Sequence, residues 1–357
     1  MSERPIIMLG IETSCDETAA AIVASDKTVY ANEIASQIEC HSKHGGVVPE
    51  IAARQHLEAI DFIILRALRT SGFSIADIDA IAATGGPGLI GGVAVGTVVA
   101  KAISAARKIP FYAINHLEGH ALSPRLVNDF DFPYLLLLIS GGHTQLLAVL
   151  GPGNYVRYGT TLDDAAGEAL DKCAKTMGLG YPGGPEIEKI AKTGDAEAIS
   201  LPRPLKGKPG CHFSFSGLKT AVVRQFRQLG GHGVAPINDL AASLQFAIAD
   251  CLSDRTLSAM ERFLFEFQRE PFSRPTLVVA GGVAANNYFS QRFMKLSEEM
   301  GFTLHIPPLD LCTDNAAMIA WAAIERYGSP DPLDFEPCPR WPLDPNADRP
   351  PGRGVRQ

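Results

Sequence analysis

The same order of strand, polar turn and strand occurs twice in this sequence, and the repeat limits the folds open to the chain. Residues 6–11, 12–18 and 19–24 form the first unit, and residues 134–139, 140–144 and 146–150 form the second. Two short apolar runs on either side of a polar turn are typical of a β-hairpin. The 357 residues also exceed the size of one small core. We therefore expect two lobes of like topology, each opening with a hairpin whose turn faces a shared cleft.

Helices and short strands alternate along the rest of the chain, which predicts an α/β fold. Apolar spacing predicts helices at 47–70, 93–106, 163–177, 237–267, 288–300 and 314–327, and strands at 78–84, 110–114, 276–280 and 303–306. Asp163 or Asp164 is expected to cap the helix that begins there. We predict an N-terminal lobe at 1–130, a C-terminal lobe at 131–344 and a flexible tail at 345–357, with helix 314–327 packing back on the N-terminal lobe.

Composition predicts a cytoplasmic protein that does not enter membranes. No apolar run reaches the roughly 18 to 20 residues that cross a bilayer, and the first residues lack the apolar core of a secretory signal. The seven cysteines contain no C-x-x-C pair, and an odd number is typical of reduced thiols. The net charge of −7 argues against a general nucleic-acid coat. One stretch without acidic residues is nonetheless basic, and its cations are Arg203, Lys206, Lys208, Lys219, Arg224 and Arg227.

The segment Asn115–His120, with the sequence N-H-L-E-G-H, is the sharpest local signal for a metal. His116 and His120 are four residues apart, so on a helix they lie about 40° apart and can chelate one ion. In a zinc protease the glutamate directly follows the first histidine, whereas Glu118 lies about 200° around the helix and points away. Two such histidines are also common on an ordinary polar face. Asp314 is the candidate third ligand, and its alternative role is a helix N-cap.

Three polar or glycine-rich turns at strand ends favour a nucleotide-like ligand beside this metal. They are residues 12–18, 140–144 and 281–286, whose backbone N–H groups and hydroxyls are suited to phosphate, although tight packing alone also explains such turns. Asp164, Glu168 and Asp171 share one face of the predicted helix. We interpret Glu168 as solvated and Asp171 as a candidate for binding ribose hydroxyls.

Six short segments of the sequence together resemble the tRNA N6-adenosine threonylcarbamoyltransferase family, whose members were once labelled O-sialoglycoprotein endopeptidases. They are residues 10–18 (GIETSCDET), 115–120 (NHLEGH), 140–146 (SGGHTQL), 181–185 (YPGGP), 281–286 (GGVAAN) and 312–315 (CTDN), in the family's order from about Ile6 to Tyr327. The resemblance implies the two-lobed actin/Hsp70/sugar-kinase-like (ASKHA) fold, with duplicated RNase H-like lobes and a central cleft. It implies a metal-dependent acyltransferase that moves threonylcarbamoyl from threonylcarbamoyl-AMP to N6 of adenosine 37, in tRNAs that read codons beginning with A (t6A formation).

The resemblance also implies a set of site residues. One Fe²⁺ or Zn²⁺ ion would bind His116, His120 and Asp314. The substrate adenylate, or ATP or ADP as a further cleft ligand, would meet Ile139, Ser140, Gly141, Gly142, His143, Asp171, Gly184 and Asn286, with Glu188 where the family often has Asp. Asp16 and Glu17 are the hypothesised catalytic pair, which would orient the acceptor amine or take its proton. Cys15 is interpreted as inert rather than as a nucleophile.

Family members of bacterial type imply three partners: tRNA, a shorter related subunit without the metal site, and a P-loop ATPase. The basic stretch 203–227 is the candidate contact for the tRNA backbone, and the helix at 93–106 is a candidate subunit surface. Three other functions are weighed against the transferase. They are metal-dependent proteolysis, which the place of Glu118 disfavours, a non-catalytic nucleotide-sensing scaffold of the same fold, and a sugar or acetate kinase.

Overall fold

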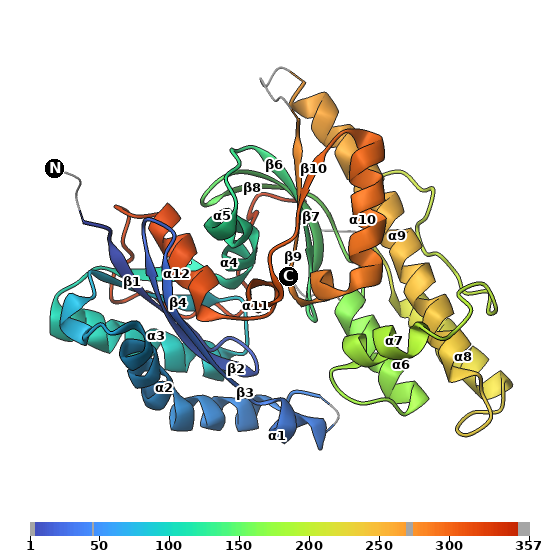
Figure 1. Ribbon diagram of the computed structural model, residues 1–357, viewed down its shortest axis with the longest axis horizontal. Coiled ribbons are helices and arrows are strands. Elements are labelled where there is room, and N and C mark those ends of the chain that lie inside the picture. The colour runs from blue at the N-terminus through green and yellow to red at the C-terminus, as the bar shows by residue number, and fades with distance from the viewer. Residues whose placement is uncertain (1–3, 45, 269–273, 349–357) are drawn as a thin grey trace.

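The computed structural model describes residues 4–44, 46–268 and 274–348 and contains two five-stranded mixed sheets (Figure 1). The first sheet has the order β3-β2-β1-β4-β5, with β1 (Ile7–Glu12), β2 (Glu17–Ala24), β3 (Val29–Ser36), β4 (Ala80–Gly86) and β5 (Phe111–Asn115). The second has the order β10-β9-β6-β7-β8, with β6 (Tyr134–Ile139), β7 (Thr144–Gly151), β8 (Asn154–Thr160), β9 (Thr276–Ala280) and β10 (Thr303–His305). The repeated hairpin predicted from the sequence is therefore confirmed.

The two sheets share one topology because each begins with an antiparallel hairpin and then adds parallel strands. β1 pairs antiparallel with β2 and parallel with β4, and β6 pairs in the same way with β7 and β9. All six residues of both β1 and β6 are buried, which explains why these strands are continuously apolar rather than alternating. The carboxyl ends of parallel strands meet at one edge of a sheet, so the polar turns after β1 and β6 lie where ligands bind in such folds.

Helices cover both faces of the first sheet and pack around the second. They are α1 (Ile38–Ser42), α2 (Pro49–Ser71), η1 (Ile75–Asp77), α3 (Ile90–Arg107), α4 (His116–Leu122), α5 (Pro124–Val127), α6 (Ala166–Met177), α7 (Gly183–Ala191), α8 (Ser216–Gln228), α9 (Ile237–Glu266), η2 (Gly282–Ala285), α10 (Asn287–Met300), α11 (Leu309–Cys312) and α12 (Ala316–Glu325). Figure 1 shows α12 across the first sheet from α2 and α3. The approach of α12 to β1 is close, because a Cβ on Gly10 would lie 2.4 Å from the carbonyl oxygen of Ala316.

Helix α3 corrects one expectation, since it is long and apolar enough by length and composition to cross a membrane. We expected no run of that kind. In the fold α3 packs against β4 and α2, and Val93, Thr97 and Ala100 on it are fully buried. The core helix of a globular protein meets the same criteria, and we interpret α3 as such a helix.

The predicted cap of α6 is wrong. The N-cap is Ala165, without a side-chain hydrogen bond. Asp163 instead accepts hydrogen bonds from the backbone N–H groups of Phe215 and Ser216, at 2.7 and 3.1 Å, and so fastens the start of α8. Asp164 lies before the helix and not on its face, and it pairs with two lysines. The start of α8 supplies the donors for Asp163, and Lys172 on α6 and Lys219 on α8 take Asp164, which the local sequence does not reveal.

The C-terminal segment 328–348, here called the C-terminal strap, crosses the edge of the first sheet and reaches the second. The backbone N–H of Asp331 donates to Phe111 at 2.8 Å, and that of Cys338 donates to Gly85 at 2.7 Å. On the second sheet, Arg157 N–H donates to the Asp344 carboxylate at 2.9 Å. The strap thus binds both sheets. Of the predicted flexible tail 345–357, residues 349–357 lie outside the described residues.

Candidate metal centre and substrate site

Three side chains from distant parts of the chain converge at the carboxyl edge of the first sheet. His116, His120 and Asp314 each offer one ligand atom, and these atoms all lie within 4.8 Å of one another. The Nε2 atom of His120 is 3.0 Å from Oδ1 of Asp314, and Nε2 of His116 is 3.6 Å from the same oxygen. Both imidazoles are buried. We call these three residues the triad.

The capping residues of two helices place the triad. Asn115 at the end of β5 caps α4 by accepting the N–H of Leu117 at 2.9 Å, so α4 starts at His116 and turns both histidines to one side. Asn315, not Asp314, caps α12 by accepting the N–H of Met318 at 3.0 Å. The cap interpretation of Asp314 is therefore wrong, and its carboxylate is free to face the histidines. Because α12 packs on α4, Asp314, the residue before the cap of α12, lies opposite them.

Glu12 holds His116 in place, and sequence reasoning missed it. Its buried carboxylate accepts the N–H of Ser14 at 2.5 Å and the hydroxyl of Thr84, and one oxygen lies 3.1 Å from Nδ1 of His116. A carboxylate on Nδ1 keeps a proton there and leaves Nε2, which faces Asp314, as the nitrogen that a metal ion would take in exchange for its proton, as in many metal sites. The available signal was an acidic residue at the end of a wholly apolar strand.

Acidic side chains outnumber basic ones around the triad, which favours the binding of a cation. Burial alone would lower the pKa of His116, but Asp314 and Glu12 raise it to about 9. Burial, followed by the charges of Asp314 and Asp16, raises the pKa of Glu17 to about 10. The carboxyl groups of Glu12, Asp16, Glu17 and Asp314 therefore lie near one another, and a bound cation would relieve their repulsion. Two imidazoles and a carboxylate are a fitting donor set for Fe²⁺ or Zn²⁺.

Asp16 lies on the turn between β1 and β2, and Glu17 is the first residue of β2. The start of α3 anchors this turn by two hydrogen bonds. Thr13 donates its hydroxyl to the carbonyl of Gly92 at 2.8 Å, and the backbone N–H of Leu89 donates to Ser14 at 2.7 Å. Gly92 has no room for a side chain, because a Cβ would lie 2.2 Å from the Thr13 carbonyl oxygen. The start of α3 therefore supports the turn closely.

A buried histidine clamps the other half of this turn. His56 on α2 has Nε2 at 3.1 Å from the carbonyl oxygen of Cys15, so Nε2 carries the proton and donates. Its Nδ1 then accepts from the hydroxyl of Thr18 at 2.8 Å and from the amide of Gln37 at 3.2 Å. Gln37 also donates its backbone N–H to Asp16 at 2.9 Å. The neutral imidazole satisfies this network, and burial lowers the pKa of His56.

Cys15 is a thiol rather than a thiolate. Burial, followed by the charge of Asp16, raises its pKa well above the usual value. A nucleophilic cysteine needs the opposite shift. The interpretation of Cys15 as inert agrees with this environment.

The loop between β6 and β7 consists of Ser140, Gly141, Gly142 and His143. Hydrogen bonds close its base, and one side of it is open. The backbone N–H of Ser140 donates to the carbonyl of His143 at 2.8 Å, and the N–H of His143 donates to the Ser140 hydroxyl at 3.1 Å. A Cβ on Gly141 or Gly142 would meet nothing within 4 Å, so this side of the loop is open. Burial, followed by the charges of His116 and His120, lowers the pKa of His143 to about 4.

Helix α6 and the end of β9 both pack closely against this loop. A Cβ on Gly167 would lie 2.6 Å from the carbonyl oxygen of Ser140, so the first turn of α6 abuts the loop. Gly281 at the end of β9 has φ of +95°, and a Cβ there would lie 2.5 Å from the carbonyl oxygen of Ile139. Parallel pairing of β6 and β9 brings Ile139 and Gly281 together. Both glycines are required by close approach of backbones.

The remaining predicted substrate residues lie on α6, α7 and the start of α10. Asp171 accepts the N–H of Gly183 at 2.7 Å, which holds the loop that carries Gly184. Burial raises the pKa of Asp171, against the hydrogen bonds from the backbone N–H groups of Gly183 and Gly184, which lower it. Glu188 accepts from the backbone and side chain of Asn287 at 3.1 and 3.0 Å.

Asn286 serves the second lobe as a helix cap. Its side chain accepts the N–H of Phe289 at 3.1 Å and donates to Gln245 at 3.2 Å. Among the described residues, Asn286 and Glu188 make no polar contact with the triad. Glu168 pairs with Lys172 at 2.8 Å, as expected for a solvated carboxylate.

Glu118 points away from the triad, as the helical geometry predicts. It is buried and accepts the N–H of Gly153 at 2.6 Å and the hydroxyl of Tyr155 at 3.0 Å. A protease base would face the metal. This arrangement argues against metal-dependent proteolysis.

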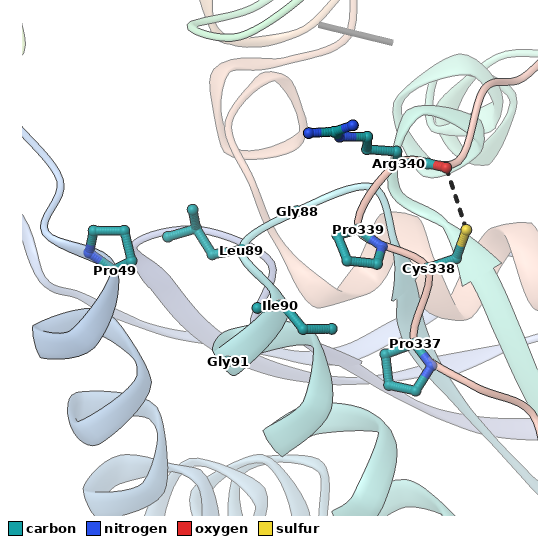
Figure 2. A pocket seen from close by; sticks show the side chains of 9 residues that line it. All are labelled: Pro49, Gly88, Leu89, Ile90, Gly91, Pro337, Cys338, Pro339 and Arg340. Carbon is teal, nitrogen blue, oxygen red and sulfur yellow. Dashed lines mark hydrogen bonds between the residues drawn. The ribbon is translucent and has the colours of Figure 1, made fainter.

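A separate cavity of about 660 Å³ lies between the start of α3 and the C-terminal strap (Figure 2). It is lined by Pro49, Gly88, Leu89, Ile90, Gly91, Pro337, Cys338, Pro339 and Arg340. Figure 2 shows Pro49 and Leu89 on one side and the three strap residues 337–339 on the other. None of the predicted site residues lines this cavity.

Duplicated hairpin turns that meet around two histidines and an aspartate define a two-lobed protein of the actin/Hsp70/sugar-kinase class with a candidate metal site. Solved structures agree with this fold. Full-length HypF is similar with a TM-score of 0.55 and 11% identity, over 90% of this chain and 46% of that one. The activator of the 2-hydroxyisocaproyl-CoA dehydratase from Clostridium difficile gives a TM-score of 0.50 and 16% identity, over 90% of this chain and 95% of that one.

Sequence comparison then identifies the family. Residues 28–321 match the family of tRNA N6-adenosine threonylcarbamoyltransferases, and the chain belongs to this family. The tRNA N6-adenosine threonylcarbamoyltransferase of Rhodospirillum rubrum is 55% identical, over 98% of each chain. The proteins of the same name from Paramagnetospirillum magneticum and Brucella anthropi are 54% and 55% identical, over 96% and 94% of this chain and 98% and 95% of theirs.

Proposed function

We propose that this protein transfers threonylcarbamoyl from threonylcarbamoyl-AMP to N6 of adenosine 37 in tRNAs that read codons beginning with A. The proposal is carried by the triad, which occurs here in a chain that belongs to the threonylcarbamoyltransferase family. The exocyclic amine attacks the carbamoyl carbonyl carbon, the bond to the AMP phosphate oxygen breaks, and the amine loses one proton. The donor is a mixed anhydride, so no covalent intermediate on the protein is required.

The triad would hold Fe²⁺ or Zn²⁺, which supplies a Lewis acid for the carbamoyl carbonyl oxygen. The open loop of Ser140–His143 offers backbone N–H groups to the leaving phosphate, where charge develops. Asp16 is the proposed acceptor of the amine proton. Glu17, with its pKa raised to about 10, is suited to donate a hydrogen bond and orient the acceptor.

The adenylate of the donor would extend from this loop into the second lobe. Ile139 and Ser140–His143 lie at the phosphate end, followed by Asp171, Gly184, Glu188 and Asn286 toward the ribose and base. The support is their order along neighbouring elements, from the end of β6 through α6 and α7 to the start of α10. ATP or ADP would share this cleft because the phosphate and ribose contacts are the same.

The proposed partners are tRNA, a short related subunit without the metal site, and a P-loop ATPase, all in the cytoplasm. Several exposed apolar side chains on α2 and α3 support a protein partner there, namely Leu57, Phe62, Leu65, Ile90 and Val98. We further propose lobes at 1–130 and 131–344.

A reconstitution tests the function. The purified chain, both partner subunits, ATP, threonylcarbamoyl-AMP and unmodified tRNA are mixed, and the digested tRNA is searched for threonylcarbamoyl-adenosine by mass spectrometry. We expect product from the wild type and from His232→Ala, an exposed control, but none from folded His116→Ala. Wild-type protein that is folded and metal-loaded yet makes no product would refute the transferase and favour the kinase or scaffold functions.

A further inference from the structure

Three cations of the second lobe gather around one buried carboxylate. Asp250 on α9 lies 3.2 Å from Nε of Arg203, 3.4 Å from Nζ of Lys206 and 2.7 Å from Nη2 of Arg292. We call Arg203, Lys206, Arg292 and Asp250 the cation cluster. Three positive charges against one negative charge leave an excess of two positive charges. Such an excess at a partly exposed site attracts anions.

Neighbouring acids do not cancel this excess. Asp254, one turn further along α9, forms an ion pair with the buried guanidinium of Arg255 and accepts the backbone N–H of Gly207. That pair is locally neutral. Lys208, exposed in the same loop, adds a further positive charge. The cluster is therefore a positive area on a chain whose net charge is −7.

The cluster is ordered before any ligand arrives. The guanidinium carbons of Arg203 and Arg292 lie 5.0 and 5.7 Å from the ring centroid of Phe246, so both are held by a ring as well as by Asp250. The side chains of Arg292 and Lys206 are 37% and 49% exposed, whereas Asp250 is 10% exposed. Arg292 uses Nη2 on Asp250, and its Nε and Nη1 have no protein partner among the described residues. Each of these N–H groups can donate a charge-assisted hydrogen bond to a phosphate oxygen.

The cluster adjoins the proposed adenylate site. Arg292 follows Asn286 by six residues on α10, which is about 9 Å along the helix. Phe246 directly follows Gln245, the residue that accepts a hydrogen bond from the Asn286 side chain. An RNA whose adenosine enters the cleft would bring its backbone within reach of these cations.

The structure also divides the basic stretch 203–227 that the sequence singled out. Lys219 pairs with Asp164 at 2.9 Å on another side of the lobe, so it does not join Arg203 and Lys206. Arg292 joins them instead, although it lies far away in sequence. The positive area is thus a different set of residues from the linear stretch.

We propose that Arg203, Lys206 and Arg292 bind phosphates of the tRNA backbone beside the substrate cleft. The inference rests on the proposed function, because it takes tRNA as the acceptor. Asp250 and Phe246 act as positioning residues that hold the two guanidinium groups. Phosphate contacts from Lys and Arg supply most of the salt-dependent affinity for a nucleic acid, without reading its sequence.

The test compares a double variant with a matched control. Lys206→Gln together with Arg292→Gln removes the excess charge and leaves Arg203 paired with Asp250, so the fold keeps its buried ion pair. Arg262→Gln is the control, because Arg262 lies on the same helix, stacks on Tyr158 at 4.0 Å and pairs with Glu266 at 2.8 Å in a locally neutral arrangement. Affinity for unmodified tRNA is measured at several salt concentrations with the metal-loaded protein and its partner subunits.

We expect the double variant to bind tRNA at least about tenfold more weakly at low salt. The slope of log affinity against log salt should fall by roughly 1.5 to 2, for two lost phosphate contacts. Arg262→Gln should match the wild type in both quantities. Equal slopes for the double variant and the control would overturn the proposal, as would weaker binding without a change of slope. Lys206→Gln alone, at an exposed position, decides the same question if the double variant does not fold.

Transfer activity separates this proposal from the function itself. At saturating tRNA the double variant should retain the wild-type kcat, with a raised KM for tRNA. Normal product formation together with unchanged salt slopes would reject the cation cluster and keep the transferase. Absence of product from the wild type would reject the transferase, whatever the salt slopes are.

Discussion

Replacement of Glu12 by Gln should weaken metal binding by changing the tautomer of His116. In the wild type the carboxylate accepts from Ser14, Thr84 and Nδ1 of His116, so Nδ1 keeps its proton and Nε2, which faces Asp314, is the nitrogen left for a metal ion. In Glu12→Gln the amide oxygen stays on the Ser14 N–H, and the NH₂ group faces His116. An N–H group opposite Nδ1–H is repulsive, so the imidazole moves its proton to Nε2. That proton occupies the position that a metal ion needs.

The size of the effect follows from the position of Glu12. Loss of a partner that orients a metal-binding histidine typically costs 10- to 100-fold in metal affinity. Glu12→Gln also removes a negative charge from a buried site next to the triad, which places it at the upper end of that range. We expect a loss of about 100-fold, or roughly 2.7 kcal/mol at 1.36 kcal/mol per tenfold change.

Competition with a chelator of known affinity measures Zn²⁺ and Fe²⁺ binding directly. Glu118→Gln is the matched control, because Glu118 is equally buried, lies on α4 between the two histidines and faces Gly153 and Tyr155 instead. It should lose stability but keep its metal affinity. A Glu12→Gln protein that binds metal within about threefold of the wild type would show that the carboxylate does not set the tautomer.

Three further variants probe the packing, the buried histidine and the catalytic turn. Gly10→Ala should lower the free energy of unfolding, measured in urea, by about 2 to 3 kcal/mol, because its Cβ would lie 2.4 Å from a backbone oxygen of α12. The control is Gly151→Ala, whose Cβ would meet nothing within 4 Å and should leave the free energy of unfolding nearly unchanged. The pKa of His56 is lowered by burial, so below pH 6.5 the unfolded chain binds more protons than the folded chain and the stability of the wild type falls. His56→Gln should flatten this fall in the free energy of unfolding between pH 7.5 and 5.5. The same slope of stability against pH in the variant and the wild type would contradict this prediction. Asp16→Asn should reduce kcat about 100-fold or more with little change in metal content, and normal activity would remove Asp16 as the base.

The fold could be predicted largely from the sequence because its signals are local. The buried strands Ile7–Glu12 and Tyr134–Ile139 are continuous apolar runs that stop at polar turns, and both hairpins occur as expected. His116 and His120 were found from helical spacing alone. Asp314 was a candidate third ligand from its place at a strand–loop–helix junction, the family resemblance implied the same role, and its cap alternative failed because Asn315 caps α12.

The parts that could not be predicted depend on contacts between distant segments. Glu12 meets His116 only because β1, β4 and β5 lie side by side in the sheet. Asp163 looked like a helix cap, but the loop before α8 supplies better donors. The cation cluster draws Arg292 from a separate helix. No local pattern contains these partners, since each pair is defined by the tertiary fold.

The packing of α12 on β1 also has a consequence for how the protein is made. The ribosome synthesises β1 and β2 first and α12 among the last elements, so the face of the sheet that carries Met8, Ala19 and Ala21 waits uncovered through most of translation. N-terminal domains usually fold as units while the rest is made, but this lobe lacks one of its layers until then. Asp314 arrives with the same helix. A chain released early therefore exposes an apolar sheet and has an incomplete triad, and only the finished polypeptide assembles the full ligand set.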